Sequence, residues 1–487
     1  MAHSTPTVGP SDAAVRRVGQ ATLLGGFAFA VLLAFALAFA HPLAGLVPIA
    51  LVLGGFGAVA AHRSSPLAPL AVAFGLFGFA SSYQAGIQPV EILFALYGYS
   101  YLGVWFGLRM WAYRERILSD LRDAVFALLP AYVVVAFVLT AVNRGSMMGA
   151  VSDAMNFSML LYYFPVREVV ARYKSGPRMV ALALGYLGAV AIVRNALLLQ
   201  SAFSSAEYAW QVTGSRAVAN EMLLLVPAVG ALAMAVHERG WLRPLVLTGV
   251  SVIFAIGVIL TQWRAYYVDL AVGILLIGVL AGAAGRRRLV GLGVVGLVAG
   301  GGLALVFFGD FVTLLVLGIA NRILSIGTAT SSDISLINRF YEWEVAWELI
   351  RANPILGYGP GVSFGFFDAI FKGTWEKSYV HNGFLLLWYK FGIFALLGIV
   401  LAWGRSIWQG WRTWRESALP HSERALAFAT AIVLLSLIPS HFVQTTFSTM
   451  DTLFAFAVVN GLVAGLGQRA ALVSPHGPHS PTAAASP

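Results

Sequence analysis

Long apolar segments recur along most of the chain and are separated by short polar stretches. A helix of about 20 apolar residues crosses the roughly 30 Å hydrocarbon core of a bilayer. The pattern therefore predicts about fourteen membrane-spanning helices in an all-α, polytopic transmembrane bundle. The expected spans lie near residues 20–40, 43–61, 67–87, 92–110, 124–142, 147–166, 179–199, 221–236, 245–262, 265–285, 289–308, 383–404, 425–440 and 452–466.

Three stretches depart from this pattern. Residues 1–18 and 470–487 are polar, and both are expected to be disordered segments in the cytoplasm. The first eleven spans occupy residues 19–308, and the last three occupy residues 382–469. Between them, residues 309–381 are expected to form one long extracytoplasmic loop domain.

The composition agrees with a membrane protein. The apolar fraction is 59% and the charged fraction 11%, and the mean hydropathy of +0.80 exceeds what a soluble domain needs. The absence of cysteine excludes disulfides, thiolate catalysis and cysteine metal sites. The net charge of +10 is attributed to cationic loops that orient the helices, and not to nucleic-acid binding.

The distribution of positive charge predicts the orientation. With the N-terminus in the cytoplasm, 21 of the 31 lysines and arginines fall at cytoplasmic helix ends and 10 elsewhere. This bias follows the positive-inside rule. It places the long loop, Arg216, Arg264 and His381 on the outer side of the membrane.

The stretch from Trp343 to Gly392 carries the most distinctive pattern. An amphipathic helix is predicted first, and Asn353-Pro354 ends it. A Gly-Tyr-Gly-Pro-Gly turn follows, which requires the backbone freedom of glycine. His381-Asn382 then precedes a new apolar helix, and nine residues separate this pair from Gly392. The apolar positions at helical spacing in the first helix are Phe340, Trp343, Trp347 and Ile350.

These motifs resemble the bacterial O-antigen ligase and O-antigen polymerase superfamily. Its members share a tryptophan-containing helix, a Pro-Leu-Gly-x-Gly-like turn, and a His-Asn pair leading into a helix broken by glycine. The chain has Ala395 where the family often has Gly, Thr or Tyr. The local signature covers about 50 residues, and the polytopic layout extends the resemblance over most of the chain.

The resemblance implies that two outer arginines bind a lipid diphosphate. Arg264 begins a helix at the place of the arginine in the family's Ser-Arg-Gly-like motif, without the usual neighbours, and Arg216 shortly precedes the eighth span. A planar guanidinium gives two parallel hydrogen bonds to phosphate. The alternatives are a snorkelling anchor for Arg264 and a solvated loop residue for Arg216.

Arg194 lies inside the seventh predicted span. Intramembrane arginines are unfavourable unless they face a polar interior or a partner. Asp153, in the sixth span, is the expected partner in a structural ion pair. A supporting role for Arg194 at the substrate is the alternative.

His381 is the candidate catalytic base, because a neutral imidazole accepts a proton near neutral pH. Asn382 is expected to cap the following helix and so fix the histidine at its rim. Nearby carboxylates could orient His381 or bind sugar hydroxyls, with Glu344 favoured, and solvated surface residues are the alternative. These carboxylates are Glu342, Glu344, Glu348, Asp368 and Glu376.

The sequence lacks a Gly-x-x-x-x-Gly-Lys-Ser/Thr loop, an Asp-x-Asp pair and a His-x-x-x-His pair. Direct ATP hydrolysis and a dedicated metal site are therefore not expected. No cofactor is expected either.

The resemblance implies an inverting, metal-independent glycosyltransferase in the bacterial inner membrane, with its active site facing the periplasm. It implies transfer of a glycan from undecaprenyl diphosphate to an acceptor hydroxyl. A polymerase acting on a lipid-linked acceptor glycan is favoured, and a ligase acting on the lipid A core is the alternative. A flippase of lipid-linked oligosaccharide is the alternative of another class. Membrane lipids and a chain-length regulator are further expected partners.

Overall fold

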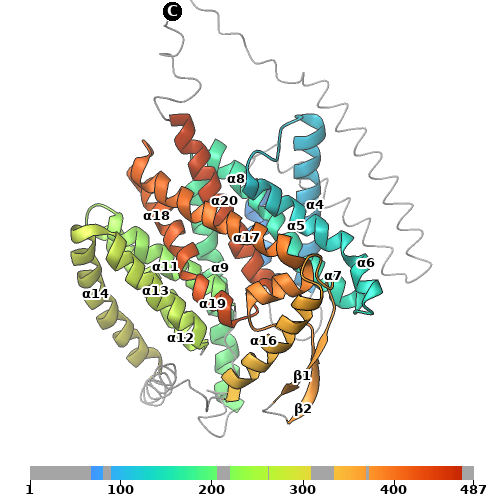
Figure 1. Cartoon of the computed structure of the whole chain (residues 1–487). Helices are drawn as coiled ribbons and strands as arrows, with labels where there is room; N and C mark the ends of the chain where they lie inside the picture. The colour runs from blue at the N-terminus through green and yellow to red at the C-terminus, as the bar shows by residue number, and fades with distance from the viewer. Residues whose placement is uncertain are drawn as a thin grey trace, which may run out of the picture. The chain divides into compact units, whose positions relative to one another are not determined.

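The computed structural model describes residues 67–80, 89–205, 220–261, 263–308, 334–368 and 372–473 (Figure 1). The chain divides into two compact units, Met1–Ala124 and Val125–Pro487. The described helices that lie wholly in the first unit are α3 (Ala68–Ala80), α4 (Pro89–Gly107) and the π-helix η1 (Leu108–Ala112). The predicted spans at 20–40 and 43–61 lie outside the described residues.

The second unit follows the predicted spans in order, and the all-α prediction is confirmed. Helix α5 begins just before the unit boundary. The α-helices are α5 (Leu121–Val135), α6 (Phe137–Val142), α7 (Met147–Ser158), α8 (Tyr163–Arg172), α9 (Gly176–Ser205), α11 (Glu221–His237), α12 (Leu242–Leu260), α13 (Arg264–Leu280), α14 (Gly282–Phe308), α16 (Ile334–Ala352), α17 (Gly383–Glu416), α18 (His421–Ser436), α19 (Ile438–Val443) and α20 (Met450–Val473). Two 3-10 turns, η2 (Met159–Tyr162) and η4 (Thr446–Ser448), join them.

The protein is a multi-pass membrane protein. Among the described residues, six segments are long and apolar enough to cross a membrane: Leu121–Val142, Gly176–Leu198, Leu242–Leu260, Gly383–Glu416, His421–Val443 and Met450–Val473. Helices α3 and α11 are shorter apolar helices. The count of about fourteen spans therefore stays a prediction.

The predicted end of the span at 265–285 is wrong, and the span at 147–166 is divided among α7, η2 and α8. The expected span at 265–285 runs through a break, because α13 ends at Leu280 and α14 begins at Gly282. Gly282 has a φ of +73°, a left-handed conformation that ends a helix and that glycine adopts without a steric penalty. The apolar pattern continues across the break, so hydropathy alone did not reveal it.

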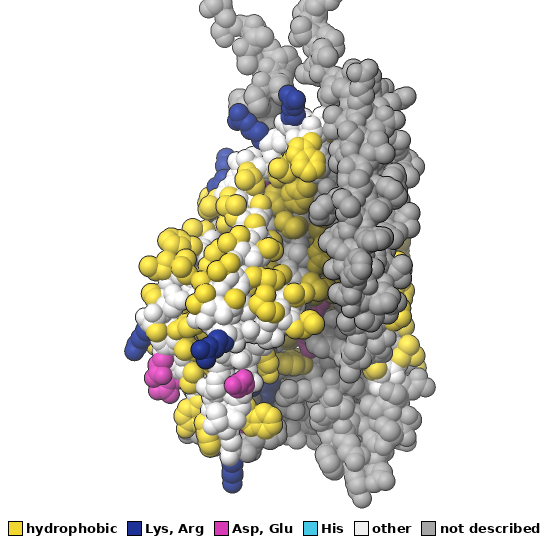
Figure 2. Space-filling view, turned by 90° about the vertical axis from the view of Figure 1, so that its right-hand side faces the viewer, with side chains coloured by type: hydrophobic (Ala, Val, Ile, Leu, Met, Phe, Trp, Pro, Cys, Tyr) yellow, Lys and Arg dark blue, Asp and Glu magenta, His cyan; other side chains and the backbone are white. Residues whose placement is uncertain are grey.

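The interior of the second unit is formed by α20 and α18. In their most apolar windows, 89% of the residues of Met450–Val473 and 72% of those of His421–Val443 are buried, against 33% in Gly176–Leu198. Outer helices instead expose large apolar side chains, such as Leu182 on α9 and Leu297 on α14. Figure 2 shows hydrophobic side chains over the middle of the described surface in that view. Such a surface suits lipid as the surrounding solvent.

Helix α17 is broken at Gly392, as the resemblance implied. Gly392 has φ 77° and ψ 178°, which interrupts the helical ladder and frees two carbonyl oxygens. The Tyr389 oxygen accepts the backbone N–H of Tyr358 at 3.0 Å, and the Lys390 oxygen accepts that of Gly359 at 2.9 Å. The glycine turn is therefore docked into the break.

The predicted turn is confirmed, and it is held from its other side by α6 and α7. Its glycines all have positive φ: Gly357 (71°), Gly359 (97°) and Gly361 (68°). The Thr140 hydroxyl donates to the Pro360 oxygen at 2.5 Å. The backbone N–H of Ser146 donates to the Gly361 oxygen at 2.9 Å. A β-carbon on Gly361 would overlap the Ser146 oxygen, so only glycine fits at this position.

The region expected as one long loop contains regular structure. It includes α16 and an antiparallel hairpin of β1 (Phe364–Asp368) and β2 (Gly373–Lys377), with Phe366 opposite Trp375. Residues 309–333 and 369–371 are not described. The extent of the loop domain and its side of the membrane stay predictions.

Candidate functional site

Helix α16 buries a face that carries polar residues. Asn338, Glu342 and Ile350 are 7%, 1% and 1% exposed and recur at multiples of four residues. Of the apolar positions at helical spacing in this helix, Phe340 and Trp347 are 53% and 37% exposed, whereas Ile350 is buried. The amphipathic helix was correctly predicted, but the burial of Asn338 and Glu342 was not. A buried carboxylate is stable only with partners, so the contacts of Glu342 are informative.

Both oxygens of Glu342 contact His381. The Oε2 atom lies 2.8 Å from the imidazole Nδ1, and Oε1 accepts the backbone N–H of His381 at 2.7 Å. The His381 side chain is 22% exposed, whereas that of Glu342 is 1% exposed. One buried carboxylate therefore holds the backbone and the ring of a partly accessible histidine.

The residues beside this pair fix the loop that carries it. The Trp343 indole N–H donates to the His381 carbonyl oxygen at 2.9 Å. The Asn382 side-chain oxygen accepts the backbone N–H groups of Phe384 and Leu385, both at 3.0 Å. The predicted helix cap is thus confirmed, and it satisfies donors at the start of α17. His381 is anchored at the rim of α17 and against α16.

Lys377 and Tyr379 complete the surroundings. The Lys377 Nζ lies 3.9 Å from Glu342 Oε2, and it stands over the Tyr379 ring at 5.4 Å from the ring centre. The Tyr379 and His381 rings meet edge to face, with centres 5.3 Å apart. Burial raises the pKa of the Tyr379 phenol, and the charges of Glu342 and Asp368 raise it further. At neutral pH this phenol therefore keeps its proton and can donate a hydrogen bond.

The geometry assigns roles to the two ring nitrogens of His381. An ionised carboxylate only accepts hydrogen bonds, so Nδ1 carries the proton that points to Glu342. In the neutral imidazole, the other nitrogen, Nε2, is then an acceptor. A carboxylate that orients an imidazole in this way is the arrangement of a general base.

Asp368 lies on a second polar link of the same helix. Its Oδ1 accepts the Asn338 side-chain N–H at 2.8 Å, and this pair joins α16 to the end of β1. Glu344, the carboxylate favoured from the sequence, has an exposed side chain two residues beyond Glu342. Its supporting role stays a prediction.

Residues of several other helices contact the segment that runs from α19 to the start of α20. Asp269 of α13 accepts the backbone N–H of Ser440 at 2.9 Å. Gly383, the first residue of α17, packs so closely here that an added β-carbon would lie 2.7 Å from the Thr446 hydroxyl oxygen. The Asn156 side chain of α7 donates to the Ser448 oxygen at 2.7 Å. The first half of α13 and the start of α17 therefore meet the same segment.

Of the two arginines predicted to bind the diphosphate, the structure describes one. Arg264 is half-buried at the first residue of α13, five residues before Asp269. Arg216 lies outside the described residues. The diphosphate role of both stays a prediction.

Arg194 contacts Asn220, whose side chain in turn donates to Asp451 at 3.1 Å. The predicted pairing of Arg194 with Asp153 is wrong. Asp153 instead contacts Lys390 Nζ at 2.6 Å and accepts the backbone N–H of Gly361 at 2.8 Å. The substrate role of Arg194 stays a prediction.

Lys390 is one of the ten basic residues away from the predicted cytoplasmic helix ends, and no partner was predicted for it. It lies inside an apolar helix next to the break at Gly392, and buried lysines are rare without a partner. This position in the sequence could have indicated that Lys390 has a buried acidic partner. In the described part of the chain, no group of three or more His, Asp or Glu side chains is arranged to hold a metal ion.

The fold and the site together define a multi-pass helical membrane protein with a carboxylate-supported histidine at a helix rim. Residues 249–400 match the family described as O-Antigen ligase. This range includes Arg264, Glu342, the glycine turn, His381 and the break at Gly392. Over 137 residues the chain is 27% identical to an O-antigen ligase of Salmonella typhimurium. This match covers 26% of the chain and 31% of that protein, so the chain spans under a third of the length of that relative. The resemblance to the O-antigen ligase and polymerase superfamily is confirmed.

Proposed function

We propose that this protein is a glycosyltransferase that moves a glycan from undecaprenyl diphosphate to an acceptor hydroxyl. The observation that carries the proposal is the contact of both Glu342 oxygens with His381. The family match, which spans both residues, supports the same chemistry.

The transfer needs one base and one leaving group. His381 Nε2 takes the proton of the acceptor hydroxyl, while Glu342 holds the opposite side of the ring. The acceptor oxygen then attacks the anomeric carbon, and the bond from this carbon to the diphosphate oxygen breaks. The bonding electron pair leaves with undecaprenyl diphosphate, and the direct displacement inverts the anomeric centre. The reaction needs no metal, because the donor is already activated.

The charge that develops on the departing diphosphate needs stabilisation. Arg264 is proposed for this role because it stands at the first turn of α13, where the helix dipole also favours an anion. Arg216 is the second proposed contact, on sequence grounds alone. The site is proposed to face the periplasmic side of the inner membrane, as the charge distribution predicts.

Two acceptors remain distinct candidates. The preference for a polymerase rests on the predicted number of spans, which exceeds what ligases usually need. The name of the matched relative, O-antigen ligase, instead favours a ligase. The acceptor expected for a ligase is the lipid A core. The two functions differ only in the molecule that supplies the hydroxyl.

The test uses purified protein in detergent with a synthetic undecaprenyl diphosphate glycan. The lipid A core and a second lipid-linked glycan are offered in separate reactions. Product with either acceptor, and its loss in His381→Ala, supports the proposal and identifies the acceptor. A flippase would form no product in detergent. Lack of product with both acceptors under conditions where the donor binds would refute the transferase function.

A further inference from the structure

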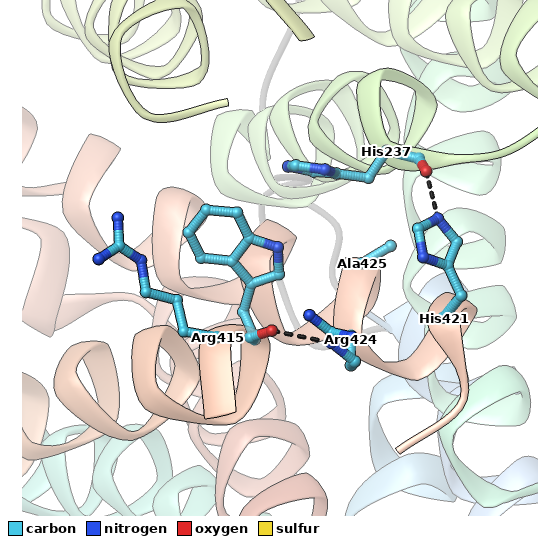
Figure 3. A pocket seen from close by; sticks show the side chains of 6 residues that line it. His237, Arg415, His421, Arg424 and Ala425 are labelled. Atoms are coloured by element: carbon cyan, nitrogen blue, oxygen red, sulfur yellow. Dashed lines mark hydrogen bonds between the residues drawn. The ribbon is translucent and has the colours of Figure 1, made fainter. Parts of the chain in front are cut away.

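A cavity of about 330 Å³ lies where the ends of α11, α17 and α18 meet (Figure 3). Its lining is basic and aromatic: His237, Trp414, Arg415, His421, Arg424 and Ala425. The volume is within the range of small-molecule binding pockets. None of these residues takes part in the proposed transfer.

The described residues that line the cavity include two arginines and no carboxylate. Among the described residues, the contacts of Arg415 are with the rings of Trp411 and Trp414, and Arg424 makes one hydrogen bond, to a backbone oxygen. Neither arginine pairs with an acid in the part of the chain that the structure describes.

Two acidic residues near the end of α17 and the start of α18 are paired with arginines that do not line the cavity. Glu416 contacts Arg412 at 2.8 Å, and Glu423 contacts Arg469 at 2.8 Å. The two lining arginines are therefore left to attract an anion from outside the protein.

Hydrogen bonds hold the walls of the cavity in place. The Nε2–H of His421 donates to the backbone oxygen of His237, which ties the start of α18 to the end of α11 (Figure 3). Arg424 Nε–H donates to the Trp414 oxygen at 2.9 Å, which ties α18 to α17. The buried Nε2 of His237 has no hydrogen-bond partner among the described residues. The cavity is thus preformed and keeps unused hydrogen-bonding capacity.

The cavity is remote from His381. His381 precedes the first residue of α17, whereas Trp414 and Arg415 lie in its last turn. From the break at Gly392 to Trp414, α17 alone extends on the order of 33 Å at 1.5 Å per residue. An anion bound here cannot be the diphosphate that reacts at His381.

The geometry points to a phosphate-binding site at the end of the bundle opposite His381. Arg415 and Arg424 supply planar, permanently charged donors that suit phosphate oxygens, and the volume leaves room for an organic substituent. The phosphate comes from an anionic phospholipid of the facing leaflet or from a soluble phosphate. A bound phospholipid would fix the ends of three helices at the membrane surface.

The test measures binding to the purified full-length protein in detergent. Phosphatidylglycerol and zwitterionic phosphatidylcholine are titrated separately and followed by native mass spectrometry, and inorganic phosphate is measured by equilibrium dialysis. Arg415→Gln is the first variant. Arg415 contacts only the rings of Trp411 and Trp414 among the described residues, and it takes no part in the hydrogen bonds that join α11, α17 and α18. Loss of a hydrogen bond to a charged group is worth roughly 1.5–3 kcal/mol, so affinity should fall by about tenfold or more.

Arg412→Gln is the matched control, since Arg412 lies on the same helix and pairs with the exposed Glu416. Arg415→Lys combined with Arg424→Lys retains charge and should bind more weakly than wild type but better than the corresponding double glutamine variant. Preferential binding of phosphatidylglycerol identifies a lipid site, and binding of inorganic phosphate a soluble one. The inference is overturned if wild type binds neither, if Arg415→Gln binds as wild type does, or if Arg412→Gln weakens binding equally.

Discussion

Replacing Glu342 by glutamine removes one negative charge and almost no volume. In the wild-type protein, one carboxylate accepts the Nδ1–H of His381 at 2.8 Å and its backbone N–H at 2.7 Å. A glutamine amide has one accepting oxygen and one donating NH₂. The amide NH₂ must therefore face one of the two N–H groups of His381, and a donor then meets a donor. The imidazole loses either this hydrogen bond or the tautomer with the proton on Nδ1.

The expected loss can be bounded from general base catalysis. A positioned base contributes about a hundred- to ten-thousandfold to the rate, and loss of an orienting carboxylate in a catalytic triad has a comparable effect. We expect Glu342→Gln to lower the single-turnover rate of glycan transfer by roughly a hundredfold or more. Donor affinity should change little, since Glu342 is 1% exposed and is not placed at the diphosphate.

The assay compares purified wild type, Glu342→Gln and Glu344→Gln with saturating lipid-linked donor. Glu344 is the matched control because its side chain is exposed on the same helix. Thermal unfolding checks the fold, where loss of a buried hydrogen bond to a charged group lowers stability by roughly 1.5–3 kcal/mol. Glu342→Asp should recover part of the rate, since it restores the charge. Transfer by a folded Glu342→Gln protein at the wild-type rate would refute the assignment.

Four further outcomes are expected. His381→Ala should abolish transfer without loss of donor binding, and normal product formation by this variant would exclude His381 as the base. In the wild-type protein, transfer should slow at acid pH, and chelators should have no effect. Arg264→Lys should lose about a hundred- to a thousandfold in rate although charge is retained, and wild-type activity would make it an anchor only. In this cysteine-free chain, Ser378→Cys should react with an impermeant maleimide in intact cells and Arg287→Cys only after permeabilisation; the reverse pattern would invert the orientation. Gly392→Ala should destabilise the protein by roughly 1–3 kcal/mol or more, because φ is +77° and a β-carbon would overlap the Ile355 oxygen; unchanged thermal unfolding would contradict this account.

Most of the helices could be predicted from hydropathy, because a bilayer requires every backbone polar group to be satisfied within the segment. Hydropathy did not reveal the break between α13 and α14, because the apolar run continues through it. The glycine turn was predictable from local chemistry, because Gly357, Gly359 and Gly361 all need positive φ. Its docking into α17 was not, since that depends on a second glycine more than 30 residues away.

The sequence pointed to His381 but not to Glu342. Five carboxylates shared the region, and the sequence reasoning favoured Glu344 over Glu342. Burial of Glu342 becomes favourable only once His381, 39 residues later, supplies two donors. The partner of Asp153 was missed for a similar reason, because Lys390 comes from a helix 237 residues away.

The buried polar contacts explain how His381, the proposed base, is held in a fixed position. Helix α16 is joined to the hairpin through Asn338 and Asp368, and to the rim of α17 through Glu342 and His381. The asparagine cap fixes His381 from the helix side, and the indole of Trp343 fixes its carbonyl. The backbone and the ring of His381 are therefore held before any substrate binds. Such preorganisation is what a general base needs, because misplacement by about 1 Å can lower a rate a hundredfold.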